Sequence, residues 1–377
     1  MKVLHFIPNL RKGGAERLVL DICTELQKHE NVTVQLITFA ESNEYRELTK
    51  RVNHRVIASH FQPSISGKSS TNIKALQEYI SGYQPDIIHS HLWESEIVLS
   101  QIHSSAIRFS HFHDNMPQLR KVRFPISKKD FTDGFEKRII FKGYRRNNVN
   151  FICISEDTFS YAKNVLPNLL LGKINLIHNG IDFDHFYSPV KAQKKQLSLI
   201  NIGSFVKKKN QKLAIQITAD LIDEKIPCDL VLLGDGPLRE DLVDYAEQLN
   251  ILDHVHFMGN IDNVAEHLSK ASIYLHTALS EPFGLVLLEA MAAGLPIVSL
   301  DGKGNRDIIN NGVNGYIISE TNVERFTKTI LMLRTNQVLY KEIATAGQIT
   351  AKEYDISSCV KNLLEIYLTS ISSVNKV

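Results

Sequence analysis

The chain has 377 residues, more than one ordinary domain holds, and its length fits two domains of roughly 150–200 residues each. Hydrophobic residues make up 43% and charged residues 22%, a balance typical of a globular protein with a sizeable core, which excludes a largely disordered chain. The formal net charge of +2 is too small to indicate a nucleic-acid-binding protein.

The four cysteines are scattered and form no C-x-x-C pair, so the sequence indicates neither a metal site nor a disulfide framework, and a reducing cytoplasm fits best. The apolar run within Met1–Pro8 is far too short for a signal peptide. No stretch approaches the about 20 apolar residues that a membrane-spanning helix requires. We therefore expect a cytoplasmic protein whose membrane contact is at most peripheral.

The first half alternates short apolar runs with helical patterns, which is typical of parallel sheets wound with helices. A first strand is expected at Lys2–Pro8, followed by a glycine loop at Gly13-Gly14 and an amphipathic helix from Ala15 to about Lys28. Further strands are expected at Val32–Phe39, Asp86–Ser90, Ile107–His111, Phe151–Ser155 and Ile174–His178.

A basic segment runs from Leu119 to Asn148, with ten Lys and Arg against three acids. Aromatic and aliphatic side chains interleave with these charges, among them Phe124, Phe131 and Phe135. The segment either lies against an anionic membrane surface or forms a solvated surface helix and loop.

The α/β rhythm stops in the polar stretch Phe183–Gln196, which is the candidate linker, and then restarts. Strands are expected at Leu197–Gly203, Asp229–Gly234, Val255–Gly259, Ser272–Leu275 and Pro296–Leu300, with helices at Gln211–Asp223 and Leu238–Leu249. The tail, from Val338 to about Ile371, has a helical pattern with a break near Asp355-Ile356. The pattern predicts an α/β fold of two doubly wound, Rossmann-like halves that face each other across a cleft.

We expect three parts in this fold. Residues 1–185 form an N-terminal Rossmann-like domain, and residues 197–352 form a C-terminal Rossmann-like domain. Residues 356–377 form a helix that crosses back to the first domain.

The segment Ser280–Pro296 is the most informative for chemistry. Its Phe283-Gly284 loop opens a helix at about Leu285, and the first amides of such a helix attract a phosphate. Glu281 and Glu289 suit a sugar ligand, because carboxylates readily accept hydrogen bonds from paired sugar hydroxyls. From the residues alone, a helix-capping acid and a surface glutamate are the favoured explanation of the pair.

These motifs resemble those of glycosyltransferase family 4, retaining enzymes of the GT-B fold that include bacterial capsule, exopolysaccharide and O-antigen glycosyltransferases. The segment from Glu281 to Pro296 resembles the family's donor-site signature, with Glu281-x7-Glu289, Phe283-Gly284 and Gly294-Leu295-Pro296. Other resemblances follow in the family's order, at Gly13–Glu16, His178–Asp182, Gly203–Phe205, Lys209-Asn210, Gly234–Pro237 and Asn311–Gly315.

The resemblance implies that residues 1–185 form the acceptor side and that residues 197–352 bind the nucleotide sugar. It also implies roles for single residues at the donor site. Glu289 would hold the nucleotide ribose, and Glu281 would act in catalysis by binding hydroxyls of the donor sugar. The donor-binding loop would include Phe283, with the backbone amides of Gly284 and Leu285 on the diphosphate.

The resemblance also implies that the Lys209 ammonium binds the diphosphate. It further implies that Gly14 allows its loop to close over the same phosphates. One position departs from the family pattern, because Ser204 stands where an arginine is usual. Either Lys207 or Lys208 compensates, or the diphosphate is held more weakly than in typical members.

A histidine follows the expected strand Ile107–His111, and the family places a histidine there, beside the transferred sugar. His113 matches best and His111 is the alternative. For His89 and His91, which end another strand, a structural role is the expectation.

The resemblance implies transfer of a hexose or N-acetylhexosamine from a nucleotide-diphosphate sugar to a glycan or lipid-linked glycan, in surface polysaccharide synthesis. No metal or other cofactor is expected, because the helix N-terminus after Gly284 and the Lys209 ammonium would stabilise the leaving diphosphate. Asp182-Phe183-Asp184 overlaps the family's Asn-Gly-Ile-Asp segment and resembles a metal-binding motif only by coincidence. Two alternatives stay open: a nucleotide-sugar-binding pseudoenzyme that scaffolds other proteins, and a UDP-sugar 2-epimerase on the same fold. No nucleic-acid partner is expected.

Overall fold

A computed structural model describes the chain at residues 1–63, 70–120, 127–192 and 196–374. It divides into two compact units, Met1–Gly180 with Ile356–Val377, and Ile181–Asp355. The first break falls earlier than the expected domain end at residue 185. The reason is local, because the Ile181 amide donates to the Tyr354 carbonyl and the Phe183 amide to the Asp355 carboxylate, which ties this segment to the second unit.

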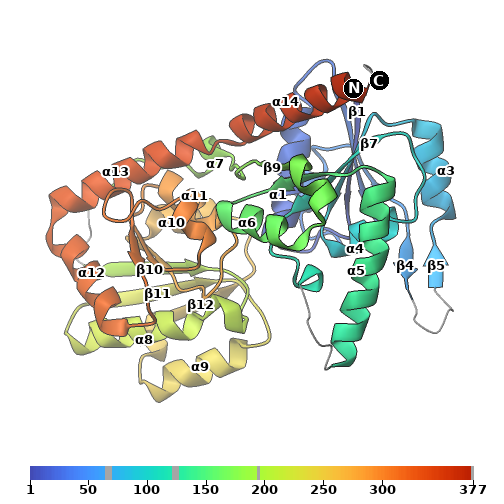
Figure 1. Cartoon of the computed structure of the whole chain (residues 1–377). Helices are drawn as coiled ribbons and strands as arrows, with labels where there is room; N and C mark the ends of the chain where they lie inside the picture. The colour runs from blue at the N-terminus through green and yellow to red at the C-terminus, as the bar shows by residue number, and fades with distance from the viewer. Residues whose placement is uncertain (64–69, 121–126, 193–195, 375–377) are drawn as a thin grey trace. The chain divides into compact units, whose positions relative to one another are not determined.

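The first unit is built on a seven-stranded sheet in the order β3-β2-β1-β6-β7-β8-β9, in which every neighbouring pair is parallel. Figure 1 labels β1, β7 and β9 of this sheet. Its strands are β1 (Lys2–Ile7), β2 (Thr33–Thr38), β3 (His54–Val56), β6 (Ile87–His91), β7 (Ile107–Phe112), β8 (Asn150–Cys153) and β9 (Ile174–Leu176). A separate antiparallel hairpin joins β4 (His60–Gln62) to β5 (Ser70–Asn72).

The helices of this unit are α1 (Gly14–Leu26), α2 (Arg46–Thr49), α3 (Lys74–Tyr83), α4 (Trp93–Leu99), α5 (Lys128–Arg146), α6 (Glu156–Val165) and α14 (Ile356–Val374). Helix α1 buries Leu18, Ile22 and Leu26, which share one face at a spacing of four residues. Helix α5 begins at a capping box in which the side chains of Ser127 and Asp130 each accept the other's backbone amide. Helix α14 packs against α1, so the end of the chain completes the first unit.

The second unit has a six-stranded parallel sheet in the order β12-β11-β10-β13-β14-β15. Its strands are β10 (Leu197–Ile202), β11 (Cys228–Leu233), β12 (Val255–Gly259), β13 (Ile273–His276), β14 (Ile297–Leu300) and β15 (Tyr316–Ile318). Its helices are α7 (Phe183–Phe186), α8 (Gln211–Asp223), α9 (Arg239–Gln248), α10 (Val264–Lys270), α11 (Leu285–Ala292), α12 (Val323–Thr335) and α13 (Gln337–Glu353). Strands β13 and β14 are buried along their whole length, as expected of strands covered on both faces.

Both sheets reverse their order once, between β1 and β6 and between β10 and β13, which is the doubly wound arrangement. The expected α/β fold class is confirmed for each unit. Across the described residues, no helix combines the length and apolar character needed to cross a membrane.

Candidate active site

Several candidate site residues lie on or directly after the strands that flank the two order reversals, the region where doubly wound sheets bind ligands. In the second unit, Lys209 follows β10 and Glu281 follows β13. In the first unit, His5 and His91 lie on the adjacent strands β1 and β6.

Glu281 is held by two basic side chains of its own unit. The Lys209 ammonium donates to Glu281 Oε2 over 2.5 Å, and Nε2 of His276 lies 3.3 Å from the same oxygen. Burial alone would raise the pKa of the Glu281 carboxyl, but the Lys209 ammonium and the His276 imidazole hold that pKa at about 2. Glu281 is therefore an ionised carboxylate at neutral pH, and sequence reasoning missed His276 as its neighbour.

The loop that carries Lys209 is fixed from the side of β13. The Thr277 hydroxyl donates to the Lys209 carbonyl over 3.0 Å, and the Leu279 amide donates to the Lys208 carbonyl over 2.8 Å. The Lys209 ammonium, which was expected to bind the diphosphate, thus forms an ion pair with the Glu281 carboxylate, which was expected to bind the sugar. The two groups are within one hydrogen bond of each other.

Gly284 precedes the first turn of α11 with a φ of +103°, a conformation that favours glycine. A Cβ at this position would lie 2.7 Å from Cδ1 of Leu287. The Phe283 side chain is 1% exposed and its ring lies 5.9 Å from that of Tyr354, so Phe283 is a core residue. Leu285 is half-buried at the start of the helix.

Glu289 lies on α11, while Glu281 lies in the loop before it, as the sequence indicated. Besides burial, both carboxylates raise the pKa of the buried Tyr274 hydroxyl. Both glutamates therefore lie near the same tyrosine of β13.

The glycine motifs after β10 and β11 allow two loops to approach closely. A Cβ on Gly234 would lie 2.2 Å from the Gly203 carbonyl oxygen, and one on Gly236 would lie 2.7 Å from the Phe205 carbonyl oxygen. Ser204, between these contacts, is exposed. The backbone of the family pattern is therefore present, with a hydroxyl where the usual guanidinium would stand.

In the first unit, Gly14 is exposed at the first turn of α1. Its neighbour Gly13 exchanges two hydrogen bonds with the Tyr45 hydroxyl, one through its amide and one through its carbonyl. A Cβ on Gly13 would lie 2.2 Å from Oε2 of Glu16. The loop is thus held from beneath and leaves Gly14 open to a ligand.

Five histidines lie on neighbouring strands of the first unit and hydrogen-bond to one another. They are His5 on β1, His89 and His91 on β6, and His111 and His113 at the end of β7. All are buried except His113, which is partly exposed. Of the two candidates for the active-site histidine, His113 is therefore the one that a ligand can reach.

Burial lowers the pKa of His5 and that of His113 to about 3, and it holds those of the other three well below the ordinary value. The array is neutral at physiological pH. His5 was missed because one histidine in a strand carries no signal by itself. The alternation His-x-His on two neighbouring strands was the signal that could have shown a shared face.

Two sets of three, His5 with His89 and His91, and His91 with His111 and His113, each have ring nitrogens within 4.8 Å of one another. Neutral imidazoles at such spacing suit a divalent metal of intermediate softness. Several of these nitrogens are already paired with each other, since the distances His5–His91 and His91–His113 are 2.9 and 2.8 Å. Hydrogen bonds between the histidines therefore occupy some of the ring nitrogens that a metal ion would need.

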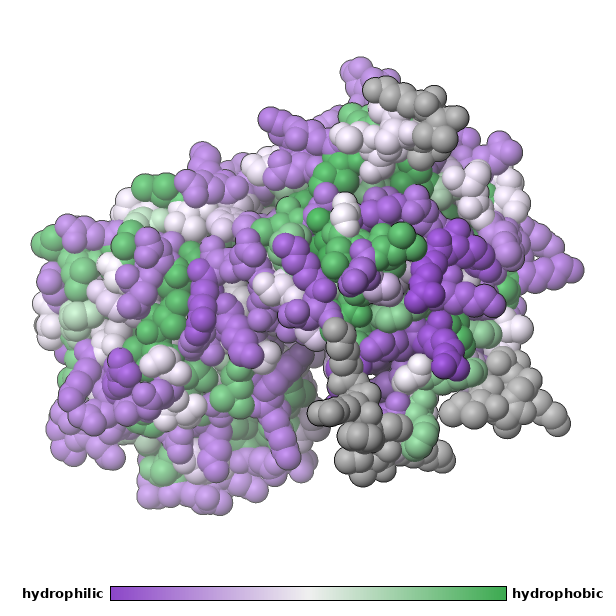
Figure 2. All heavy atoms as spheres, in the orientation of Figure 1, coloured by the Kyte–Doolittle hydropathy of each residue, from purple (hydrophilic) through white to green (hydrophobic). Residues whose placement is uncertain are grey.

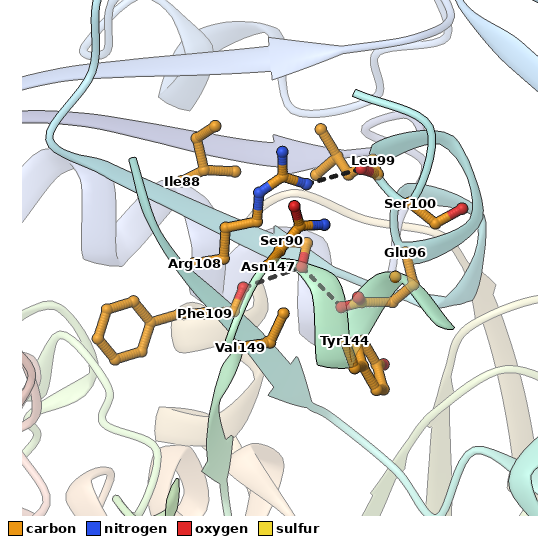
Figure 3. Close-up of a pocket in the computed structure, with 11 residues that line it drawn as sticks. Ile88, Ser90, Glu96, Leu99, Ser100, Arg108, Phe109, Tyr144, Asn147 and Val149 are labelled. Carbon is orange, nitrogen blue, oxygen red and sulfur yellow. Dashed lines mark hydrogen bonds between the residues drawn. The ribbon is translucent and has the colours of Figure 1, made fainter. Parts of the chain in front are cut away.

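A buried acidic group lies on the other face of β6 and β7. Oε1 of Glu96 accepts from both Ser90 and Ser110 over 2.6 Å, as Figure 3 shows for Ser90. These serines alternate with the histidines along the strands, so they point to the opposite side of the sheet. Burial raises the pKa of Glu96 to about 7. The adjoining cavity, about 20 Å³, has room for one water and is also lined by Arg108 and Asn147.

Helix α5 forms the described part of the basic segment, and residues 121–126, with Phe124, lie outside the described residues. Phe131 is 56% exposed, and an open groove is lined by Gly134, Lys137, Arg138, Phe141, Lys142 and Arg145. On the face shown in Figure 2, strongly hydrophilic side chains cover α5 with hydrophobic ones beside them. The helix thus offers cations and an exposed aromatic ring together.

Comparison with known proteins identifies the class. Residues 12–185 match the family Glycosyltransferase Family 4, and residues 183–350 match Glycosyl transferases group 1. Together the two matches run through both units, and the chain is a glycosyltransferase of the GT-B type. The expected enzyme class and the expected family are confirmed.

Individual relatives agree with this class. An uncharacterized glycosyltransferase of Methanocaldococcus jannaschii is 28% identical over 61% of this chain, a region that spans 62% of that relative's length. An uncharacterized glycosyltransferase of Haemophilus influenzae is 23% identical over 96% of this chain and 98% of its own. The crystal structure of Anabaena HepE with UDP-glucose is similar in fold, with a TM-score of 0.78 and 18% identity over 98% of this chain and all of that one.

Proposed function

We propose that this glycosyltransferase retains anomeric configuration, needs no metal ion, and moves a hexose or N-acetylhexosamine from a nucleotide-diphosphate sugar to a glycan or lipid-linked glycan. The observation that carries the proposal is the ion pair of Lys209 with Glu281 beside the start of α11. One partner suits the diphosphate and the other suits sugar hydroxyls.

In the proposed mechanism, donor binding separates this pair. The diphosphate draws the Lys209 ammonium and the first amides of α11, at Gly284 and Leu285, while the carboxylate of Glu281 accepts hydroxyls of the sugar. Glu289 holds the ribose. The UDP-glucose bound to HepE of Anabaena supports a uridine donor.

As the anomeric C–O bond breaks, negative charge grows on the leaving diphosphate and the sugar becomes oxocarbenium-like. The ammonium and the helix terminus stabilise that charge, and a divalent cation is then not required. We propose that the acceptor hydroxyl attacks from the same face and that the departing phosphate oxygen takes its proton. His113 orients the sugar and is not a nucleophile.

The test is a screen of UDP-, GDP- and ADP-sugars in EDTA, which follows release of free nucleoside diphosphate and thermal stabilisation. We expect one donor to stabilise the protein and to be turned over slowly without metal, and we expect Glu289→Ala to lose both effects. Dependence on an added divalent cation would refute the metal-independent mechanism. Anomeric configuration of the isolated product, read by NMR, tests retention.

The same screen separates the alternatives. Binding of one donor without turnover, with candidate acceptors present, would indicate a pseudoenzyme that scaffolds other proteins. Appearance of a 2-epimeric sugar would indicate an epimerase. No binding of any nucleotide sugar would overturn the assignment of the second unit.

We also propose that α5 brings the enzyme to an anionic membrane surface where a lipid-linked acceptor lies. Support comes from its cations together with the exposed Phe131 ring. Sedimentation with vesicles should show binding to phosphatidylglycerol but not to phosphatidylcholine alone, with a loss of binding at high salt. Arg138→Glu with Lys142→Glu should abolish it, whereas the charge change Lys270→Glu on α10, outside the basic segment, should not.

A further inference from the structure

The five histidines form two hydrogen-bonded rows rather than a cluster without order. In the first row, Nδ1 of His5 lies 2.9 Å from Nε2 of His91, and Nδ1 of His91 lies 2.8 Å from Nε2 of His113. The ring centroids are 5.2 and 5.1 Å apart. Such spacing, with nitrogens in contact, places the rings end to end across β1, β6 and β7.

The second row lies beside the first. The Tyr367 hydroxyl of α14 is 2.5 Å from Nδ1 of His89, and Nε2 of His89 is 3.2 Å from Nδ1 of His111. Rings of the two rows stack, with centroids 4.6 Å apart for His89 and His91 and 4.3 Å for His111 and His113. Each row therefore fixes the ring planes of the other.

A row of neutral imidazoles has a direction. Each neutral ring carries a single N–H, so a ring that accepts at one nitrogen must donate from the other. Burial keeps the pKa of His5, His91 and His113 low enough for all three to stay neutral. The row therefore has two forms, one in which every Nδ1 carries the proton and one in which every Nε2 does.

The buried end of the row selects between the two forms. Nε2 of His5 is inaccessible and has no hydrogen-bond partner among the described residues. In the second form this nitrogen would carry an N–H with no acceptor. Among backbone groups, orphaned buried N–H groups are rarer than under-satisfied carbonyls, and the same preference in an imidazole disfavours the second form. The first form leaves a lone pair there instead, so the proton lies on Nδ1 of His5 and the direction runs towards His113.

We propose that His5 and His91 are positioning residues that hold His113 as its Nδ1–H tautomer. Nε2 of His113 accepts from His91, and its Nδ1–H remains to donate a hydrogen bond to a substrate oxygen. This inference rests on the proposed role of His113 and adds to it: the group offers a donor, which suits an oxygen of the transferred sugar, and it does not offer a base. The bare sequence shows neither the row nor its direction.

The test is nitrogen NMR of the full-length protein with ¹⁵N-labelled histidine, in which protonated and unprotonated ring nitrogens differ widely in shift. His113 is assigned by the signal lost in His113→Asn. We expect the proton on Nδ1 of His113 in the wild type. We expect His5→Leu and His91→Phe to release that preference, so that an Nε2–H signal appears, while His103→Leu, at an exposed histidine, leaves it unchanged.

A proton on Nε2 of His113 in the wild type would overturn the proposal, as would an unchanged tautomer in both row variants. Thermal melting checks that the variants fold. If His91→Phe does not fold, the tautomer of His113 in His5→Leu still tests the proposal. In turnover, His5→Leu should lower kcat about tenfold, the scale of one hydrogen bond, with the donor KM within about twofold. If the wild type shows the expected tautomer but turns over no donor, the proposed function fails and the row stands.

Discussion

The Tyr367 hydroxyl lies 2.5 Å from Nδ1 of His89, although the two residues are 278 positions apart in the chain. Tyr367 is fully buried, and its ring also meets that of Phe109 edge-on, with centroids 4.9 Å apart. The last helix thus joins the histidine array as well as covering the sheet.

Removal of this hydroxyl should destabilise the first unit. Tyr367→Phe keeps the ring and leaves Nδ1 of His89 without its partner, so we expect a loss of about 1–3 kcal/mol in the free energy of unfolding. Urea unfolding, followed by the backbone signal in far-ultraviolet circular dichroism, measures this loss. Leu368→Ala, at an exposed neighbour on the same helix, should change the free energy by much less. Equal effects in the two variants would contradict the role given to the hydroxyl.

The Lys209–Glu281 pair should make stability depend on acid pH. Lys209→Met leaves a buried carboxylate without its ammonium, which we expect to cost about 1–3 kcal/mol at pH 7. Because the pKa of Glu281 is about 2 in the folded protein and 4.5 is its ordinary value, the stabilisation is present above pH 4.5 and is lost as the pH falls towards 2. The difference between wild type and variant should shrink over that range.

Urea unfolding at several pH values between 7 and 3 measures this difference. Lys208→Met, at the exposed neighbouring lysine, is the matched control and should match the wild type throughout. A difference that stays constant with pH would show that the ammonium acts through packing and not through the charge of Glu281.

Glu96 should have the opposite pH dependence. Its folded-state pKa of about 7 lies above the ordinary 4.5, so the folded protein holds a proton that the unfolded chain releases. The stabilisation is complete below pH 4.5 and is lost as the pH rises through 7. Glu96→Gln, which imitates the protonated acid, should therefore gain stability relative to the wild type between pH 5 and 8.

Thermal melting across that pH range measures the effect. Glu94→Gln, on the exposed face of the same helix, should follow the wild-type profile. If Glu96→Gln has the same slope as the wild type, the carboxyl is ionised throughout and the Ser90 and Ser110 hydroxyls stabilise its charge.

Ser204 should limit affinity for the diphosphate. Ser204→Arg supplies a guanidinium at an exposed position of the loop after β10, and a charge-assisted hydrogen bond of about 1.5–3 kcal/mol corresponds to roughly tenfold or more in Kd. Calorimetric titration with nucleoside diphosphate measures it, with Ser204→Gln as the uncharged control. An unchanged Kd would indicate that Lys207 or Lys208 already supplies the missing charge.

Much of the fold could be read from local patterns. The runs at Lys2–Pro8 and Leu197–Gly203 predicted β1 and β10, and the break near Asp355 separates α13 from α14. Short elements such as β3 and β15 were missed, because strands of three residues carry too little periodicity to stand out from loops. The placement of Glu281 in a loop and Glu289 on the following helix was also readable, since a glycine marks the start of α11.

Residue types and their order along the chain are readable without a structure: the two glutamates at a fixed spacing, the glycines at strand ends, and the alternating histidines. These are local signals, and local sterics and hydrogen bonding decide them. The contacts between these residues, in contrast, depend on how the chain folds. Lys209 contacts Glu281 because β10 and β13 are neighbours in the sheet, and His5 reaches His113 because β1, β6 and β7 lie side by side. Such contacts depend on strand order and on burial, which lowers the pKa of each imidazole, and neither is a property of any short segment.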